Sequence, residues 1–535
     1  MRPVWILIII LVTAAYLRIY NLDKNPPAAY GDEISFAWNA WNILKTGTDE
    51  YGMSFPLQFR AFDDYKAPIP VYLLVPFLTV FGLNTFAVRL PIAIFAVATI
   101  WITYLLGAQL INKKIGLVSA LLLTISSWHL HLSRGFFEST LSLFFFVTAL
   151  YFFIIAKSDL KKITISAVFF TLTLYSYFTP RIFLVLFIPF LFWWSRRQLG
   201  KEKIQVIGFW AVLIVLLLPL IYLSLFNKGL SRIQKLTAQR ESAIVKQVEF
   251  DRVSADAPLY IQKLLHNKPL YWVKFVLNDY LEQLSLNFWY VSGDSSLRYF
   301  LGQMGMFYLI ELPFLIIGLP VLWSKSRSSF WLILGWLLLS PVPASLSGRP
   351  FGVRSLAMLP APFFIVASGL DSVWRYLKNH SLWMVKLVIV TGFGLSIGYY
   401  LVRYHVEYPH YAATWWGWEN KVALDLALRD QDKYDQIFLS NFYSGLDLAF
   451  AYYIEQDPLQ YRQVKGDPVM LVDGRMFWKF GKFYIGSLDL DKERLSQGLI
   501  PPKSLYIGRP EEADSAETIT APDDGRILFK IYRTE

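Results

Sequence analysis

Long apolar runs recur along this chain, and they limit the folds that it can adopt. A helix that crosses a bilayer needs about 20 apolar residues in succession. The first run is Pro3–Leu17 behind Arg2, and further runs lie near Leu90–Ile111, Ile115–Leu130, Thr140–Ala156, Ile163–Phe178, Ile182–Trp194, Ile204–Leu225, Met304–Trp323, Phe330–Val342, Leu356–Leu370 and Leu382–Val402. Several are short, so their helices must extend into the flanking polar residues. The sequence predicts an all-α polytopic membrane protein with about eleven transmembrane helices.

Composition supports this class and excludes several others. Only 17% of the 535 residues are charged, against about 25% in soluble domains. The chain has no cysteine, which excludes disulfides, thiol catalysis and cysteine-based metal sites. Its histidines form no HExxH pair of the kind that binds catalytic zinc. The net charge of +11 resides largely in short loops, so it indicates membrane orientation and no nucleic-acid partner.

Basic residues between the runs set the predicted orientation. They gather in alternate short loops, at Lys113 and Lys114, Lys157 to Lys162, Arg196 to Lys203, Lys325 and Arg327, and Arg375 and Lys378. Such loops stay on the cytoplasmic side, which requires that the proline-interrupted segment Ile69–Gly82 lies along the interface instead of crossing. A cleaved signal peptide is the alternative for the first run, but no clear cleavage site follows it.

The outside of the plasma membrane then holds three large segments. These are the loop 18–89, the loop 227–302, which is mixed in charge and predicted to be helical, and the chain after residue 402. Predicted strands lie at Gln436–Ser440, Phe483–Ile485, Ser504–Ile507 and Arg526–Tyr532, and predicted helices at Asn420–Leu428 and Leu446–Ile454. We therefore predict a transmembrane domain, 1–402, and a small extracytoplasmic α/β domain, 403–535.

Acids and one cation gather in the first outer loop. Asp32 and Glu33 are adjacent, and two such carboxylates can raise the pKa of one of them enough to make a base. A solvated pair at the start of a helix is the alternative. Asp63, Asp64 and Lys66 precede two prolines, and Lys66 can hold a lipid phosphate or extend along the interface.

Two later outer loops add further charges. Arg134 and Glu138 lie in SRGFFEST, where a functional pair and a simple helical i, i+4 pair are both open. Arg349 and Arg354 lie in SGRPFGVR, and the planar fork of arginine matches phosphate geometry. Anchoring at the membrane surface is the alternative for these two arginines.

The order of these features resembles a known family. An outer DE pair, an acid–Lys–Pro stretch, FGLNTFAVRLP and SRGFFE follow one another between Tyr16 and Tyr151. This order is similar to the GT-C fold glycosyltransferases that use polyprenyl-phosphate sugars, in particular family 39, the protein O-mannosyltransferase and aminoarabinose-transferase superfamily. Tyr65 and Ala67 depart from the family pattern around Lys66.

The resemblance implies roles for these residues. Asp32 and Glu33 match the catalytic pair, with Asp32 as the base, and the second acid falls on Asp63, Asp64 or Glu138. The cations that would hold the donor phosphate are Lys66, Arg134 and either Arg349 or Arg354.

The implied reaction is transfer of a sugar, such as a mannosyl group, with inversion at its anomeric carbon. The donor is a polyprenyl-phosphate sugar, and the acceptor is a hydroxyl of a protein, lipid or glycan. The resemblance implies no particular cofactor, and Asp32 and Glu138 could contribute to a divalent metal site.

A transporter or flippase for a lipid-linked or small anionic substrate is the alternative from another class. Such a protein places ionisable residues near the bilayer midplane. Glu311 is the exception in predicted spans that are otherwise nearly free of charge. A membrane scaffold that only binds through its outer domain is a third alternative.

Overall fold

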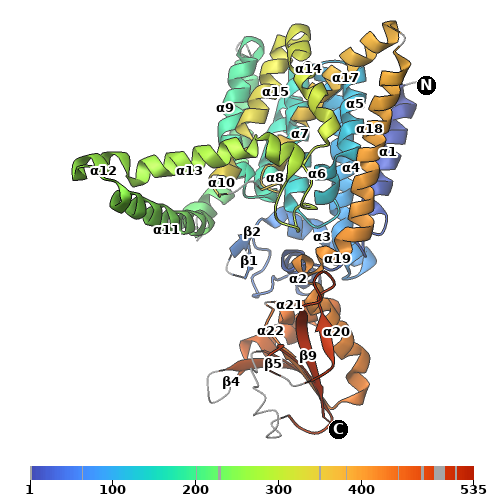
Figure 1. Ribbon diagram of the computed structural model, residues 1–535, viewed down its shortest axis with the longest axis vertical. Coiled ribbons are helices and arrows are strands. Elements are labelled where there is room, and N and C mark those ends of the chain that lie inside the picture. Colours follow the sequence, from blue (N-terminus) through green and yellow to red (C-terminus); the bar gives the residue numbers. More distant parts are fainter. Residues whose placement is uncertain are drawn as a thin grey trace. The chain divides into compact units, whose positions relative to one another are not determined.

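The computed structural model describes residues 3–62, 64–199, 202–226, 231–348, 351–380, 382–443, 445–470, 475–486, 500–512 and 515–534. The chain divides into two compact units, coloured by sequence in Figure 1. The first unit comprises Met1–Tyr20, Ala61–Ile69 and Ile92–Leu401. The second comprises Asn21–Arg60, Pro70–Pro91 and Val402–Glu535.

Helices build the first unit, and a helix forms at each predicted apolar run. They are α1 (Pro3–Ile19), α4 (Thr85–Leu110), α5 (Lys113–Ile125), α6 (Ser127–Leu132), α7 (Glu138–Ala156), α8 (Leu160–Ser176), α9 (Pro180–Leu199), α10 (Lys203–Phe226), α14 (Leu312–Lys325), α15 (Arg327–Leu339), α16 (Val342–Ser345), α17 (Ala361–Asn379) and α18 (Trp383–Val402). These apolar helices and the fold place the chain among the integral membrane proteins.

The predicted count of eleven spans is not confirmed. Five helical stretches in the described part of the chain are long and apolar enough to cross a membrane: Thr85–Leu110, Glu138–Ala156, Lys203–Leu223, Arg327–Ser345 and Trp383–Tyr411. Several other helices at the predicted runs, among them α1, α5, α8 and α14, have fewer than 18 residues. The 13 residues of α5, for example, rise only about 20 Å, less than the roughly 30 Å hydrocarbon core.

Close approach of α14 and α17 depends on two glycines. A Cβ on Gly318 would lie 2.0 Å from the carbonyl oxygen of Ile365, and one on Gly369 would lie 2.1 Å from that of Phe314. No real side chain tolerates such distances, so the backbones of the two helices can touch only because both residues are glycine. This is the small-residue packing that membrane helices use where apolar burial offers no driving force.

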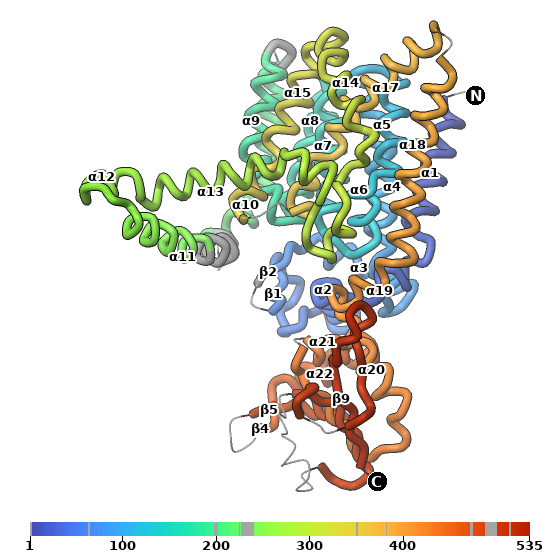
Figure 2. Tube along the Cα trace, in the orientation of Figure 1, coloured from blue at the N-terminus to red at the C-terminus, as the bar shows by residue number. Residues whose placement is uncertain are grey.

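Within the predicted helical loop 227–302, the described residues from 231 to 283 are confirmed as mainly helical. They form α11 (Ser231–Ser254), α12 (Leu259–Leu265) and α13 (Lys268–Gln283), and Figure 2 shows α11 and α13 as neighbouring rods that extend from the helices of the first unit. Tyr271 of α13 packs against Ile244 and Val248 of α11. Residues 287–311 return the chain to α14 through the short helices Asn287–Val291 and Leu309–Glu311.

A seven-stranded sheet forms the centre of the second unit, in the order β4-β5-β6-β3-β7-β9-β8. Its strands are β3 (Gln436–Ser440), β4 (Val469–Met470), β5 (Met476–Phe480), β6 (Phe483–Gly486), β7 (Ser504–Gly508), β8 (Thr518–Thr520) and β9 (Ile527–Arg533). The central strand β3 pairs in parallel with β6 and β7, and the outer strands are antiparallel. All four predicted strands are confirmed.

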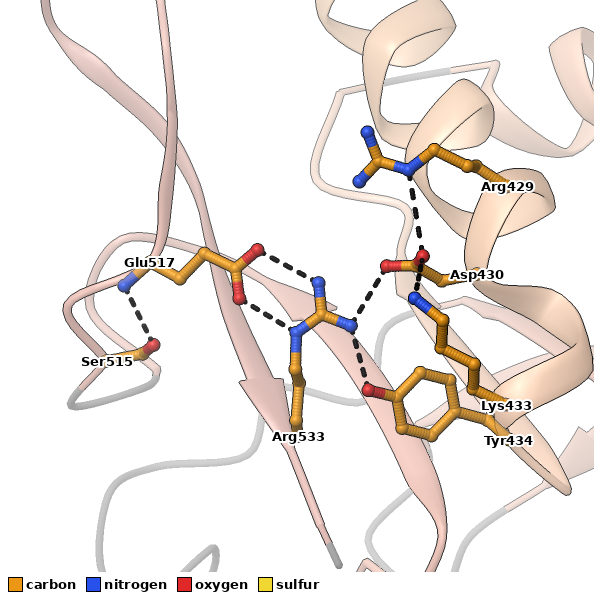
Figure 3. Close-up of polar contacts among 7 residues, drawn as sticks. All are labelled: Arg429, Asp430, Lys433, Tyr434, Ser515, Glu517 and Arg533. Atoms are coloured by element: carbon orange, nitrogen blue, oxygen red, sulfur yellow. Dashed lines mark hydrogen bonds and ion pairs between the residues drawn. The ribbon is translucent and has the colours of Figure 1, made fainter.

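Helices α20 (Trp418–Asp430) and α21 (Leu446–Tyr453) also lie where they were predicted, and α22 (Pro458–Gly466) and the short α19 (Tyr408–Tyr411) accompany them. A polar network connects the end of α20 with β9 (Figure 3). Arg533 donates to both oxygens of Glu517 and, at 3.0 Å, to Asp430, which also accepts from Lys433 at 2.9 Å. The network fixes the last strand of the sheet to a helix about a hundred residues earlier.

The second unit also contains part of the first outer loop. Helix α2 (Gly31–Thr46) packs on α21 and α22, where Trp38 meets Tyr461 edge-to-face at 5.0 Å. After α2, Arg462 of α22 donates to the Thr48 hydroxyl at 2.9 Å and to the Asp49 carbonyl at 2.8 Å. The predicted domain boundary at residue 402 stays a prediction. The structure adds that the chain after it packs with segments from the first hundred residues.

Short elements complete the described chain. Strands β1 (Phe59–Ala61) and β2 (Asp64–Lys66) precede α3 (Pro68–Phe81), which is apolar but shorter than a span. This helix occupies the segment predicted to lie along the interface, and that location stays a prediction. Glu311 ends the short helix Leu309–Glu311 and caps the start of α14. It therefore does not lie in the middle of a helix, as the predicted span Met304–Trp323 implied.

Candidate active site

Glu33 and Arg89 form a buried ion pair in the second unit. Glu33 lies in the first turn of α2 and Arg89 near the start of α4. The Nε and Nη2 atoms of Arg89 each donate to one carboxylate oxygen of Glu33 at 3.0 Å, and neither side chain is exposed. This two-point contact is the strongest geometry for such a pair. Arg89 was not among the predicted site residues, although it is the arginine of the FGLNTFAVRLP stretch on which the resemblance rests.

Arg89 also holds the segment that precedes α2. Its Nη1 donates to the carbonyl oxygens of Leu22 at 3.1 Å and Pro26 at 2.9 Å, and its Nη2 donates to that of Ala28 at 2.6 Å. The Arg89 guanidinium lies 5.4 Å from the Trp416 ring, which in turn meets Tyr30 edge-on at 5.3 Å. The ion pair therefore fixes the backbone on which Asp32 is carried.

Asp32 differs from its neighbour in exposure. It lies one residue earlier in the first turn of α2, and its side chain is only partly buried, whereas that of Glu33 is wholly buried. The N-terminal turn of a helix carries a partial positive charge that favours the ionised carboxylate. Of the two predicted catalytic acids, Asp32 is thus the one that solvent or a substrate can reach.

Lys66 ends β2 in the first unit, two residues before Pro68 begins α3. Its side chain is partly buried. Asp64 is the first residue of the same strand, and Asp63 lies outside the described residues. The strand and the proline together fix the direction of the backbone at Lys66.

Arg134 lies between α6 and α7, and Glu138 is the first residue of α7. The two do not share a helix, so the simple helical pair is wrong for them. Arg134 is fully buried, and its Nη1 and Nη2 donate to the carbonyl oxygens of Leu17 at 2.9 Å and Tyr20 at 2.7 Å. A cation that satisfies the carbonyls at a helix C-terminus stabilises that helix, here α1.

Arg354 lies in a loop of the first unit that surrounds a small cavity. Its guanidinium stacks 4.3 Å from the Phe351 ring, and its Nη1 is buried without a hydrogen-bond partner among the described residues. The cavity measures about 10 Å³, and Ser139, Tyr177 and Thr179 also line it. The Ser139 hydroxyl is likewise buried and unpaired in the described structure. A cavity of this size holds about one water-sized group. Arg349 lies outside the described residues.

Contacts from three other segments hold the Arg354 loop. Asp294 accepts a hydrogen bond from the Gly352 amide at 2.6 Å, and the Trp128 indole donates to the Gly352 carbonyl at 3.0 Å. The Ser355 hydroxyl donates to Gln283 at the end of α13. These buried groups fix the backbone on both sides of Arg354. Asp294 could not be found from the sequence, because its partner is a backbone amide 58 residues away.

Within the described parts of the chain, no group of three or more acidic or histidine side chains could hold a metal ion. The predicted contribution of Asp32 and Glu138 to a metal site stays a prediction.

Comparisons with known proteins agree with the predicted fold. A family model described as dolichyl-phosphate-mannose-protein mannosyltransferase matches residues 65–222. No curated protein matches the sequence.

Two solved structures are similar to this chain. One is ArnT from Cupriavidus metallidurans bound to undecaprenyl phosphate, with a TM-score of 0.54 and 12% identity over 99% of this chain and 98% of that one. The other is the oligosaccharyltransferase AglB from Archaeoglobus fulgidus, in complex with an inhibitory peptide and a dolichol-phosphate, with a TM-score of 0.51 and 13% identity over 84% of this chain. This chain spans 63% of the length of AglB. Together the matches confirm the resemblance: the chain has the GT-C fold of polyprenyl-phosphate-dependent glycosyltransferases.

Proposed function

We propose that this GT-C chain is a membrane glycosyltransferase that moves a sugar, such as a mannosyl group, from a polyprenyl-phosphate donor to an acceptor hydroxyl on the outer face of the plasma membrane. The observation that carries the proposal is Arg354, which lines a cavity and whose buried Nη1 has no hydrogen-bond partner among the residues that the structure describes. An unpaired buried donor is costly, and a phosphate oxygen is a ligand that would satisfy it.

The proposed reaction is a single displacement at the anomeric carbon. The acceptor hydroxyl attacks that carbon, its proton passes to the Asp32 carboxylate, and the bond from the carbon to the phosphate oxygen breaks. The lipid monophosphate leaves with the bonding electron pair, and the anomeric centre is inverted. Asp32 is assigned as the base because it is the accessible acid of the pair, while Arg89 occupies both oxygens of Glu33.

Cations that face the departing phosphate stabilise the charge it develops, which is usually the largest catalytic contribution. We assign this role to Arg354 and Lys66. Arg134 is assigned a positioning role instead, since two of its donors hold carbonyls at the end of α1. The match of the family model to residues 65–222 includes Lys66 and supports a mannosyl donor.

The test uses a polyprenyl-phosphate mannose labelled in the sugar, supplied to membranes that contain the full chain. Release of lipid phosphate and transfer of label are followed for the wild type, for Asp32→Asn and for Asp23→Asn, an exposed acid in the same loop. Loss of a general base lowers the rate about a hundredfold or more, so Asp32→Asn should lose transfer and Asp23→Asn should keep it. Undiminished transfer by Asp32→Asn would reject the base assignment.

The donor and the reaction class are tested in the same membranes. Arg354→Gln should reduce transfer, with Arg327→Gln, an exposed arginine at the start of α15, as the matched control. Among donors that carry mannose, glucose or aminoarabinose on the same lipid, mannose should be used fastest. Movement of the intact donor across the membrane without sugar transfer would favour the flippase alternative and reject the enzyme.

A further inference from the structure

A groove of about 590 Å³ lies between α5, α17 and α18 in the first unit. Its walls are almost wholly apolar and include Leu121 of α5, Trp374 of α17 and Val390 of α18. Ligand pockets in proteins measure about 300–1,000 Å³, so the groove is large enough for a substantial molecule. It shares no lining residue with the cavity beside Arg354.

In the described part of the chain, this groove is open beside α18. Leu121 is 45% exposed and Val390 57% exposed. Gly394, which also lines the groove, has no heavy atom within 4 Å of the position that a Cβ would take. In the membrane, an apolar hollow of this kind must be filled by hydrocarbon, because water there would face no polar partner.

Cations converge on one end of the groove. The Asp371 carboxylate, which is 6% exposed, contacts Lys114 at 2.7 Å, Arg375 at 3.0 Å and Lys325 at 3.2 Å. Lys386 lies 5.9 Å from the Trp374 ring on the same part of the groove wall. One carboxylate neutralises one cation, so this end keeps an excess of positive charge. The Lys114 and Arg375 side chains are more than half exposed and can reach a further anion.

The basic end lies far from Arg354 within the same unit. Lys114 is in the first turn of α5, and Arg134 comes later in the chain, after both α5 and the short α6. Arg375 is in the last part of α17, and Arg354 precedes its start. Because α5 has 13 residues, the two ends are separated by about 20 Å. The orientation predicted from the basic loops places Lys114 at the cytosolic face, whereas the donor phosphate is proposed to bind at the outer face.

We propose that this groove binds one anionic phospholipid of the surrounding bilayer. An acyl chain fills the apolar groove, and the headgroup phosphate binds Lys114 and Arg375 beside Asp371. Basic pockets between membrane helices on the cytoplasmic side select anionic headgroups in this way. A zwitterionic lipid would bring its own cation to the same end and would bind more weakly. The bound lipid would hold α18 against α5 and α17.

The experiment is native mass spectrometry of the full chain purified in detergent and titrated with phosphatidylglycerol or with phosphatidylcholine of the same acyl chains. Phosphatidylglycerol should bind in a one-to-one complex and phosphatidylcholine should not. Lys114→Gln leaves Asp371 its two other cations. It should weaken the affinity for phosphatidylglycerol about fivefold, because one basic residue near an anionic lipid contributes about 1 kcal/mol to binding. Gly394→Phe places a ring in the open groove and should abolish binding.

The matched control is Lys161→Gln, an exposed lysine that is also predicted to be cytosolic but lies on α8, away from the groove. It should bind phosphatidylglycerol as the wild type does. Equal retention of the two lipids, or full binding by Gly394→Phe, would overturn the proposal. Displacement of phosphatidylglycerol by polyprenyl phosphate would assign the groove to the donor lipid instead. If Gly394→Phe does not fold, as judged by its melting temperature, the Lys114→Gln comparison decides.

Discussion

The buried pair of Glu33 and Arg89 offers a test that separates a positioning acid from a catalytic one. Arg89 donates to both carboxylate oxygens of Glu33 and also to three backbone carbonyl oxygens. Arg89→Met would leave a buried carboxylate and three carbonyls without their donor. Glu33→Gln would keep an acceptor oxygen for Arg89 and would leave the carbonyl contacts intact. We therefore expect Arg89→Met to lower the free energy of unfolding more than Glu33→Gln does.

The sizes of the two losses in stability follow from the contacts that each substitution removes. Removal of one partner of a buried ion pair costs about 3–5 kcal/mol, which applies to Arg89→Met. Loss of one charge-assisted hydrogen bond costs about 1.5–3 kcal/mol, which applies to Glu33→Gln. Each kcal/mol lowers the melting temperature of a domain of this size by about 2–4 °C. Arg89→Met should therefore lower it by about 10 °C and Glu33→Gln by about 5 °C.

The assay is thermal unfolding of the purified chain in detergent, measured together with sugar transfer at a temperature at which all variants are folded. Asp32→Asn should lose transfer and keep its melting temperature, because its side chain is only partly buried. Glu33→Gln should lose stability and retain much of its transfer. A Glu33→Gln variant that is as stable as wild type but inactive would refute the positioning role and would make Glu33 catalytic.

Three further predictions concern other charged groups. Arg354→Lys keeps the charge but loses the planar fork, so it should restore only part of the transfer that Arg354→Gln loses. Burial, and then the nearby Asp447 carboxylate, raise the pKa of Glu50 to about 7. Because this pKa is raised on folding, the free energy of unfolding should fall as the pH rises from about 4.5 to about 7. Hydrogen bonds from Lys433 and then Arg533 lower the pKa of Asp430 to about 2. The ionised Asp430 carboxylate therefore stabilises the fold above pH 4, and this contribution to the free energy of unfolding should be lost as the pH falls towards 2.

Each of these three predictions can be contradicted by a defined result. Transfer by Arg354→Lys equal to that of wild type would show that charge alone suffices there. Glu50→Gln should abolish the decrease in melting temperature between pH 4.5 and 7, and a decrease that persists would assign it to another group. Arg533→Gln should cost about 1 kcal/mol at pH 7 and should reduce the loss of stability in acid. An unchanged acid profile would exclude Arg533 as its source.

The sequence predicted the elements of this fold well where the signal is local. Helices form at the apolar runs, and the strands at 436–440 and 504–507 lie where turn residues bound an apolar stretch. Hydrophobicity and turn propensity act over a few residues, so they can be read from neighbours in the sequence. The number of crossings could not be derived in the same way, because some helices at the apolar runs, such as the 13-residue α5, are shorter than the roughly 20 residues that cross a bilayer.

The sequence by itself determined the membrane class and the GT-C resemblance, and that resemblance predicted Asp32 as the base. Only the tertiary structure decided how the charges pair. Glu33 meets Arg89 across 56 residues, and Arg134 meets the end of α1 across more than a hundred. The physical reason is that a buried charge is stable only with a partner, and packing of distant helices determines which partner is near. Hydropathy therefore predicted which charged residues flank the apolar runs. The fold distinguishes those that hold the backbone from Arg354, whose Nη1 has no partner in the described part of the chain.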